Sequence, residues 1–206
     1  MRNDAPQVLI GEEGAALIEA ALVLPLILLL VFGLMEVSFY AWNLNLAAKA
    51  VQLGVRRAIV SDPVATGPGL VRTESAAYWR DLPPGLRCLP AGRDPSPCPT
   101  FAVTCDLSTG CTCHGNACGF TPSGGRLAPI LAAMRAVLPG IRSENVQVSY
   151  ATNALGYVGR PPPVPVDVTI RLIGLEYESL ILGDLIGRRI PLRASATLPG
   201  EDLTSR

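Results

Sequence analysis

Six cysteines form the densest group of reactive side chains in the sequence, and all of them lie between residues 88 and 118. The surrounding segment is rich in Pro, Gly, Ser and Thr, so it buries too little apolar area to offset its chain entropy without covalent links. An even number of cysteines in such a segment is typical of an oxidising compartment. We therefore expect disulfides among Cys88, Cys98, Cys105, Cys111, Cys113 and Cys118. The sequence leaves their pairing open, except that Cys111 and Cys113 are too close along the chain to pair with each other.

A metal site is the alternative use of these thiols. His114, the only histidine, directly follows Cys113 and stands near three other cysteines. The spacing differs from the paired C-x2-4-C pattern of structural zinc sites, and thiolates compete poorly with oxidation outside the cytoplasm. The sequence therefore favours disulfides over a zinc or redox module, and we expect neither a metal nor a cofactor.

Motifs of catalysis and of nucleic-acid binding are absent from the sequence. It holds no Gly-x-Ser-x-Gly, no His-Glu-x-x-His, no phosphate loop and no dinucleotide fingerprint. A single histidine leaves few residues for a general base. Lys plus Arg and Asp plus Glu each number 17, for a formal net charge of zero, so no basic face indicates nucleic acid. We expect the chain not to be an enzyme.

The most apolar part of the sequence is the charge-free run from Ala20 to Met35. With its flanks it extends over residues 15–42, which exceeds the roughly 20 residues that a helix needs to cross a bilayer. A buried core helix that is apolar on every face would need a much larger protein around it. A cleaved signal peptide would have a shorter apolar stretch and a more basic start. We expect residues 15–42 to span a lipid bilayer.

The helix is expected to continue beyond the membrane over residues 43–62, because the hydrophobic pattern becomes amphipathic there. Pro63 disfavours a helical residue before it, so the helix should end near that point. One face then carries apolar residues at helical spacing, namely Leu44, Ala47, Ala48, Val51, Val55, Ala58 and Ile59. This stripe should pack on a globular domain formed by residues 63–206.

That domain is predicted to be α+β, with a small antiparallel sheet. A helix is expected over residues 126–138, and alternating apolar residues predict strands over 145–152, 164–172 and 190–198. Residues 83–125 should form an irregular lobe that disulfides hold together. A short helix over 71–82 and an exposed loop over 153–163 complete the expected fold.

The start of the apolar helix resembles a known family. Gly14 stands before two small residues, Glu19 follows five positions later, and Pro25 lies in the opening of the apolar run. With Gly33, Glu36 and an Ala/Arg-rich continuation, this pattern resembles the TadE-like family of pseudopilins from tight-adherence (Flp-type) pilus systems. The closing segment 190–197 is similar to the usual C-terminal end of that family.

This resemblance implies that a prepilin peptidase cuts after Gly14, which leaves Ala15 as the new N-terminus and removes residues 1–14 as a leader. It also implies that the helix packs against other pilin-like subunits in a hetero-oligomer, through Glu19, Pro25, Gly33 and Glu36. A carboxylate inside a membrane costs about 2.5 kcal/mol or more, and a neighbouring α-amino group could offset that cost at Glu19. Alternatively Glu19 is a solvated flank at the headgroup level, as we expect of Glu36.

Two indications conflict on the orientation in the membrane. Lys49, Arg56 and Arg57 follow the apolar run, whereas only Arg2 precedes it, and by charge alone the domain would face the cytoplasm. The cysteines and the resemblance favour a bacterial inner-membrane protein with a periplasmic domain and incorporation in a surface pilus. We therefore expect a minor pseudopilin. The alternatives are a tethered binding or adhesive domain unrelated to pili, and a metal-binding or redox module.

Overall fold

The computed structural model describes residues 12–67, 70, 79, 82–88, 98, 100–113, 116–153, 157–158, 165–179, 183, 189–201 and 203. The chain divides into two compact units: residues 1–41 with 178–189, and residues 42–177 with 190–206. The expected domain boundaries, which separate a leader, two helical parts and a C-terminal domain, stay predictions. Most of the expected helix over 71–82 and most of the expected loop over 153–163 lie outside the described residues.

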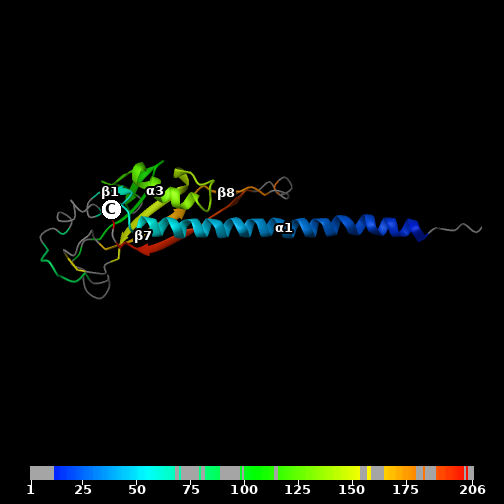
Figure 1. Cartoon of the computed structure of the whole chain (residues 1–206), viewed down its shortest axis with the longest axis horizontal. Helices are drawn as coiled ribbons and strands as arrows, with labels where there is room; N and C mark the ends of the chain where they lie inside the picture. Colours follow the sequence, from blue (N-terminus) through cyan, green and yellow to red (C-terminus); the bar gives the residue numbers. More distant parts are fainter. Residues whose placement is uncertain are drawn as a thin grey trace, which may run out of the picture. The chain divides into compact units, whose positions relative to one another are not determined.

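Helix α1 spans Glu12–Ala58 without interruption and passes through Pro25 (Figure 1). The prediction of one long helix is confirmed, although the helix ends at Ala58, four residues before the expected end at residue 62. Arg56 and Arg57 occupy the last turn, where positive charge interacts favourably with the helix dipole. The helix ends where the chain turns at Ser61, whose hydroxyl donates to the carbonyl oxygen of Arg57 at 2.7 Å.

Six antiparallel strands form the main sheet, in the order β10-β7-β6-β2-β3-β4. Two pairs of short strands accompany it, β1 (Ala65–Thr66) with β5 (Thr121–Pro122), and β8 (Glu176–Tyr177) with β9 (Ile190–Pro191). The strands of the main sheet are β2 (Ala102–Asp106), β3 (Gly110–Cys113), β4 (Asn116–Ala117), β6 (Val146–Thr152), β7 (Val166–Leu172) and β10 (Ser195–Pro199).

The predicted α+β class with an antiparallel sheet is confirmed, with two differences in detail. The first is that β2, β3 and β4 come from the cysteine segment, which we expected to be irregular, and they extend the main sheet. The second is that the expected strand over 190–198 is divided into β9 and β10. The first difference arises because these strands are short and carry few apolar residues, so alternation alone does not reveal them. The second arises because the pairing partner changes from β7 to β8 at Gly174, which interrupts the ladder opposite residues 192–194.

The core lies between one face of the sheet and two helices. Helix α3 (Gly124–Arg135), which was expected over residues 126–138, buries Leu127, Ile130, Leu131 and Met134. The C-terminal half of α1 contributes small buried residues to the same core cluster. At Gly54 the approach is close, because an added Cβ atom would lie 2.8 Å from Met134 Cγ and 3.2 Å from Ile170 Cδ1. Helices α1 and α3 therefore meet strand β7 at this glycine.

A buried tyrosine fixes the chain where it leaves α1. The Tyr150 hydroxyl, on β6, accepts a hydrogen bond from the Val64 amide at 2.9 Å. The Val64 carbonyl accepts from the Ser123 amide at 2.8 Å, just before α3. Burial strongly raises the pKa of Tyr150, which remains neutral at ordinary pH. These bonds satisfy backbone groups that would otherwise be buried without partners.

The opposite face of the sheet is polar. One row of hydroxyl side chains crosses five neighbouring strands in register, formed by Thr112, Thr104, Ser149, Thr169 and Thr197. Thr104 and Ser149 are hydrogen-bonded at 2.9 Å, and Thr169 and Thr197 at 2.8 Å. The sheet thus has the apolar-in, polar-out alternation of an antiparallel sheet with one face in water.

Replacing Gly54 by leucine should destabilise the domain, because the core around Met134 and Ile170 has no room for the side chain. Overpacking of this kind costs about 1 to 3 kcal/mol, measurable by urea-induced unfolding in detergent. Gly33→Leu is the matched control on the same helix, since nothing lies within 4 Å of a Cβ atom there. Equal unfolding midpoints for the two variants would contradict the close packing at Gly54.

Candidate functional site

The N-terminal part of α1 presents an apolar surface that its own chain leaves largely uncovered. Among the described residues, one helix is long and apolar enough to cross a membrane, with a mean hydropathy of 2.7 in its most apolar window and none of that window buried. Leu17 and Leu22 are 72% and 70% exposed, and Trp42 is 65% exposed. Exposed apolar area of this extent marks contact with lipid or with other protein. Trp42 suits a membrane interface, where indole rings are enriched.

The expected processing residues lie in the first turns of this helix. Gly14 is exposed, and nothing in the described chain lies within 4 Å of a Cβ atom built there. Ala15 follows in the helical backbone, and Glu19 is exposed one turn later. Gly14, Ala15 and Glu19 thus lie within two turns of the same helix, where Gly14 and Glu19 are exposed.

Of the other expected packing residues, Pro25 is exposed and Gly33 is partly covered. Glu36 differs from the expected solvated flank, because only 5% of its surface is exposed. Gly33 and Tyr40, which stand one turn before and one turn after Glu36, are also partly covered. One narrow stripe of the helix is therefore covered within the chain, while the rest of its circumference is open.

All six cysteines are in disulfides, as the sequence predicted. The pairs are Cys88–Cys98, Cys105–Cys111 and Cys113–Cys118. Cys105 and Cys111 lie directly opposite each other on β2 and β3, and Cys105 is buried in the main core. Cys88 and Cys98 are buried in a smaller apolar cluster with Trp79. The sulfurs that a zinc site would need are thus bound to one another, and His114 lies outside the described residues.

Asp106 holds the turn between the two strands that the Cys105–Cys111 disulfide joins. Its carboxylate accepts hydrogen bonds from the amides and hydroxyls of Ser108 and Thr109, at 2.5 to 2.9 Å. Burial acts to raise the pKa of Asp106, but these hydrogen bonds outweigh burial, so the pKa lies below its ordinary value. The ionised carboxylate is therefore part of the turn.

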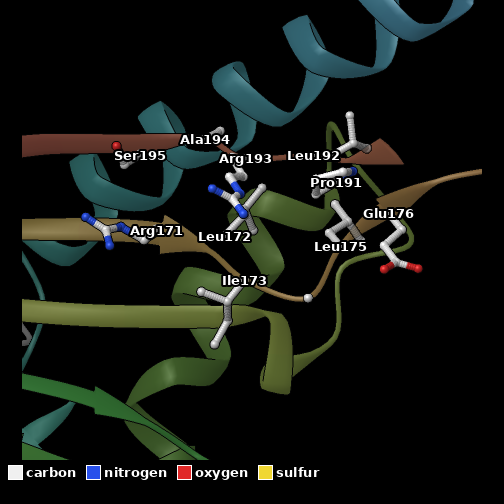
Figure 2. A pocket seen from close by; sticks show the side chains of 11 residues that line it. Arg171, Leu172, Ile173, Leu175, Glu176, Pro191, Leu192, Arg193, Ala194 and Ser195 are labelled. Carbon is white, nitrogen blue, oxygen red and sulfur yellow. The ribbon is translucent and has the colours of Figure 1, made fainter. Parts of the chain in front are cut away.

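An open cavity of about 580 Å³ lies beside β7 and β10, and sequence reasoning missed it. Figure 2 shows Arg171 and Ser195 on adjacent strands, with Arg193 between Ser195 and Leu192. The sequence carried one signal, a glycine at position 174 between two runs of alternating residues. Glycine inside a strand pattern often marks a bulge.

The pattern of residues along the exposed helix is that of a known family. Residues 14–56 match the TadE-like protein family. The match begins at Gly14 and ends in the last turn of α1, so the resemblance seen in the sequence is confirmed over the helix. A match to this family suggests involvement in the Tad pilus system. The sheet and the disulfides lie outside the matched residues, and no curated protein and no solved structure matches the chain.

Asp106→Asn should weaken the domain by about 1 kcal/mol at neutral pH, because the amide offers one acceptor atom fewer to four donors. A carboxylate with a lowered pKa stabilises the fold above its unfolded pKa and loses that effect as the pH falls through the folded pKa. The difference between wild type and variant should therefore be constant above about pH 5 and shrink below about pH 4.

Urea unfolding at a series of pH values measures this difference. Glu144→Gln serves as the control, because Glu144 forms only an exposed ion pair with Arg142. A difference between wild type and Asp106→Asn that does not change down to pH 2 would show that the charge of Asp106 contributes nothing.

Proposed function

We propose that this protein is a membrane-anchored minor pseudopilin, which takes part in assembly of a tight-adherence (Flp-type) pilus by packing its helix against other pilin-like subunits. The observation that carries the proposal is the coincidence of the family match with the uncovered helix. Residues 14–56 match the TadE-like family, and the same stretch holds most of the exposed large apolar residues of the described chain. The role is structural rather than catalytic.

Helix packing in a membrane needs more than apolar side chains. Lipid tails are as apolar as leucine, so association comes from close contact at small residues and from polar pairs. Glu19 offers a polar residue on the open side of the helix, and the partly covered Gly33 offers a small residue with nothing within 4 Å of an added Cβ atom. In the proposed assembly, Glu19 pairs with the amino group that cleavage creates at Ala15, on its own or a neighbouring chain.

The proposed location is the bacterial inner membrane, with the domain in the periplasm. Three disulfides support this side of the membrane, because disulfides persist in oxidising compartments. Lys49, Arg56 and Arg57 oppose it by the positive-inside rule. Two of these three, Arg56 and Arg57, cap the dipole of α1, a structural role that explains their position independently of topology.

We propose a minor rather than a bulk subunit because of the domain that follows the helix. A disulfide-linked sheet domain is much larger than the small bulk pilins that the family resemblance implies. Such a subunit suits the start or the end of a filament, where few copies are needed. The second candidate, a tethered binding domain unrelated to pili, is favoured by the one fact that the sheet and disulfides lie outside the family match.

Gly14→Leu should block processing, because a bulky side chain replaces the exposed glycine at the proposed cleavage site. The unprocessed protein should remain in membranes and migrate more slowly than the wild type. Mass spectrometry of the wild-type protein should find Ala15 as the first residue. Gly33→Leu, a change of the same kind deeper in the helix, is the control and should be processed normally. A wild-type protein that starts at Met1 would contradict the proposal.

Glu19→Ala should spare cleavage but reduce association with other pilin-like proteins. A buried charge that loses its partner destabilises a complex by about 3 to 5 kcal/mol, so co-purification from mild detergent should fall at least tenfold. Quantitative mass spectrometry of the purified complexes measures this loss.

Glu144→Ala is the matched control, because it removes an exposed carboxylate from the surface of the domain. Intact disulfides in both variants, checked by non-reducing electrophoresis, show that the fold is retained. Undiminished association and normal piliation of Glu19→Ala would show that Glu19 is only a solvated flank, and would favour the tethered binding domain.

A further inference from the structure

The cavity beside β7 and β10 is built around an interruption in strand pairing. The Leu172 amide donates to the Ala194 carbonyl at 2.9 Å, and the Leu192 amide donates to the Leu175 carbonyl at 2.8 Å. Between these bonds, the two residues Ile173 and Gly174 stand opposite the single residue 193. This two-to-one arrangement is a β-bulge, a feature that redirects side chains and is common beside functional sites.

The bulge is held in place rather than loose. Gly174 has a φ of +62°, a conformation that glycine adopts without steric cost. The Ile173 amide donates to the Asn145 carbonyl at 2.9 Å, and the Asn145 side-chain amide donates to the Ile173 carbonyl at 3.1 Å. These two bonds fasten the bulge to the start of β6. The cavity beside the bulge is therefore largely preformed.

Two arginines stand at this cavity on the same face of the sheet. Arg171 is opposite Ser195 in the register, and Arg193 precedes Ser195 by two residues, which returns it to the same face. Diagonal neighbours of this kind lie about 7 to 8 Å apart, within reach of long side chains. Both arginines are exposed, and within the described residues no ion pair or hydrogen bond engages either guanidinium. Two guanidiniums can thus converge on one oxyanion.

The other lining residues narrow the class of ligand. Glu176 is the one carboxylate of the lining, and it has interactions of its own. Arg171 and Arg193 contribute two positive charges to the cavity, and Glu176 contributes one negative charge. This balance suits a ligand with a single carboxylate better than a doubly charged phosphate. The apolar side chains of the lining are aliphatic, as in Leu175, Leu192 and Pro191, and none is aromatic. Rings of sugars and bases would find no aromatic surface to stack on.

The neighbouring edge of the sheet can pair with an extended chain. The bonds from Leu172 to Ala194 and from Gly200 to Val166 direct alternate residues of β10 toward β7. By the alternation of antiparallel ladders, Ser195 and Thr197 direct their amide and carbonyl groups away from β7. β10 is the terminal strand of the main sheet as far as the structure describes it. Pro199 has no amide, so pairing would stop at that residue.

We propose that β10 and the adjoining cavity bind an extended acidic segment of a partner protein by strand addition. The backbone of the segment pairs with Ser195 and Thr197, and a carboxylate side chain beside β10 reaches Arg193 and Arg171. Aliphatic side chains next to that carboxylate pack on the half-buried Leu175. Backbone pairing gives affinity in this mode of recognition, and the side chains give specificity. The site does not depend on how α1 packs in a membrane.

Fluorescence anisotropy tests this site with the full chain purified in a nonionic detergent. The probes are labelled eight-residue peptides in which Val alternates with Glu, with Gln or with Lys. The Glu peptide should bind at least tenfold more tightly than the Gln peptide, as expected for a charge-assisted pair, and the Lys peptide should bind more weakly still. Equal binding of the Glu and Gln peptides would overturn the proposal.

Three variants separate the parts of the site. Arg171→Gln and Arg193→Gln should each lower the affinity for the Glu peptide about tenfold. Thr197→Pro removes an amide that β7 does not use, so the fold should be retained, whereas binding of both the Glu and the Gln peptide should fall. Arg142→Gln, which removes an arginine that forms an ion pair with Glu144, is the control and should bind like the wild type. Unchanged binding of the Glu peptide by Thr197→Pro would exclude strand addition.

Anionic lipid is the other source of an oxyanion and is tested separately. Vesicles of phosphatidylglycerol and phosphatidylcholine, added in place of the peptides, should bind wild type and Arg171→Gln/Arg193→Gln equally. The proposal is wrong if the double variant loses vesicle binding and the wild type does not bind the Glu peptide. In that case the site recognises a lipid headgroup.

Discussion

The close approach of α1 to strand β7 at Gly54 is the constraint on which the domain depends. Small residues recur along this side of the helix, Ala47, Ala50, Gly54 and Ala58, and all four are buried. They let the helix backbone approach the sheet, so that Ile170 and Met134 fill the space that larger residues would occupy. The helix therefore changes character along its length, from large apolar residues on an open surface to small residues in a packed core.

The parts of the fold that were predictable are those in which periodicity is long and apolar. Helix α1 and strands β6 and β7 carry such patterns, and their predicted positions agree with the structure. Strands β2 and β3 escaped prediction because Cys105 takes the place of an apolar core residue there, so the apolar alternation that marks a strand is not visible in the sequence. Disulfide pairing depends on tertiary register, which composition does not contain.

The residues of the candidate sites can also be divided into those that were predictable from the sequence and those that were not. Gly14, Glu19 and Gly33 were predictable, since a helix places them by spacing alone. The burial of Glu36 was not, because it depends on contacts that spacing does not specify. Arg171 and Arg193 also escaped prediction, since they come together only when the bulge at Gly174 brings two distant segments into register. Strand alternation makes such arginines look like ordinary surface residues.

The disulfide pattern bears on how the domain of this protein oxidises. The six cysteines pair consecutively along the chain, the first with the second, the third with the fourth and the fifth with the sixth, with sequence separations of 10, 6 and 5 residues. A polypeptide that is released into an oxidising compartment with its N-terminal end first exposes these cysteines in the order in which they pair. The loops between paired cysteines are short, and short loops close quickly. The first thiol of each pair can react with the next thiol to emerge, before the following pair is exposed. Oxidation in order of emergence yields the native pairing directly, without a need for isomerisation of mismatched bonds.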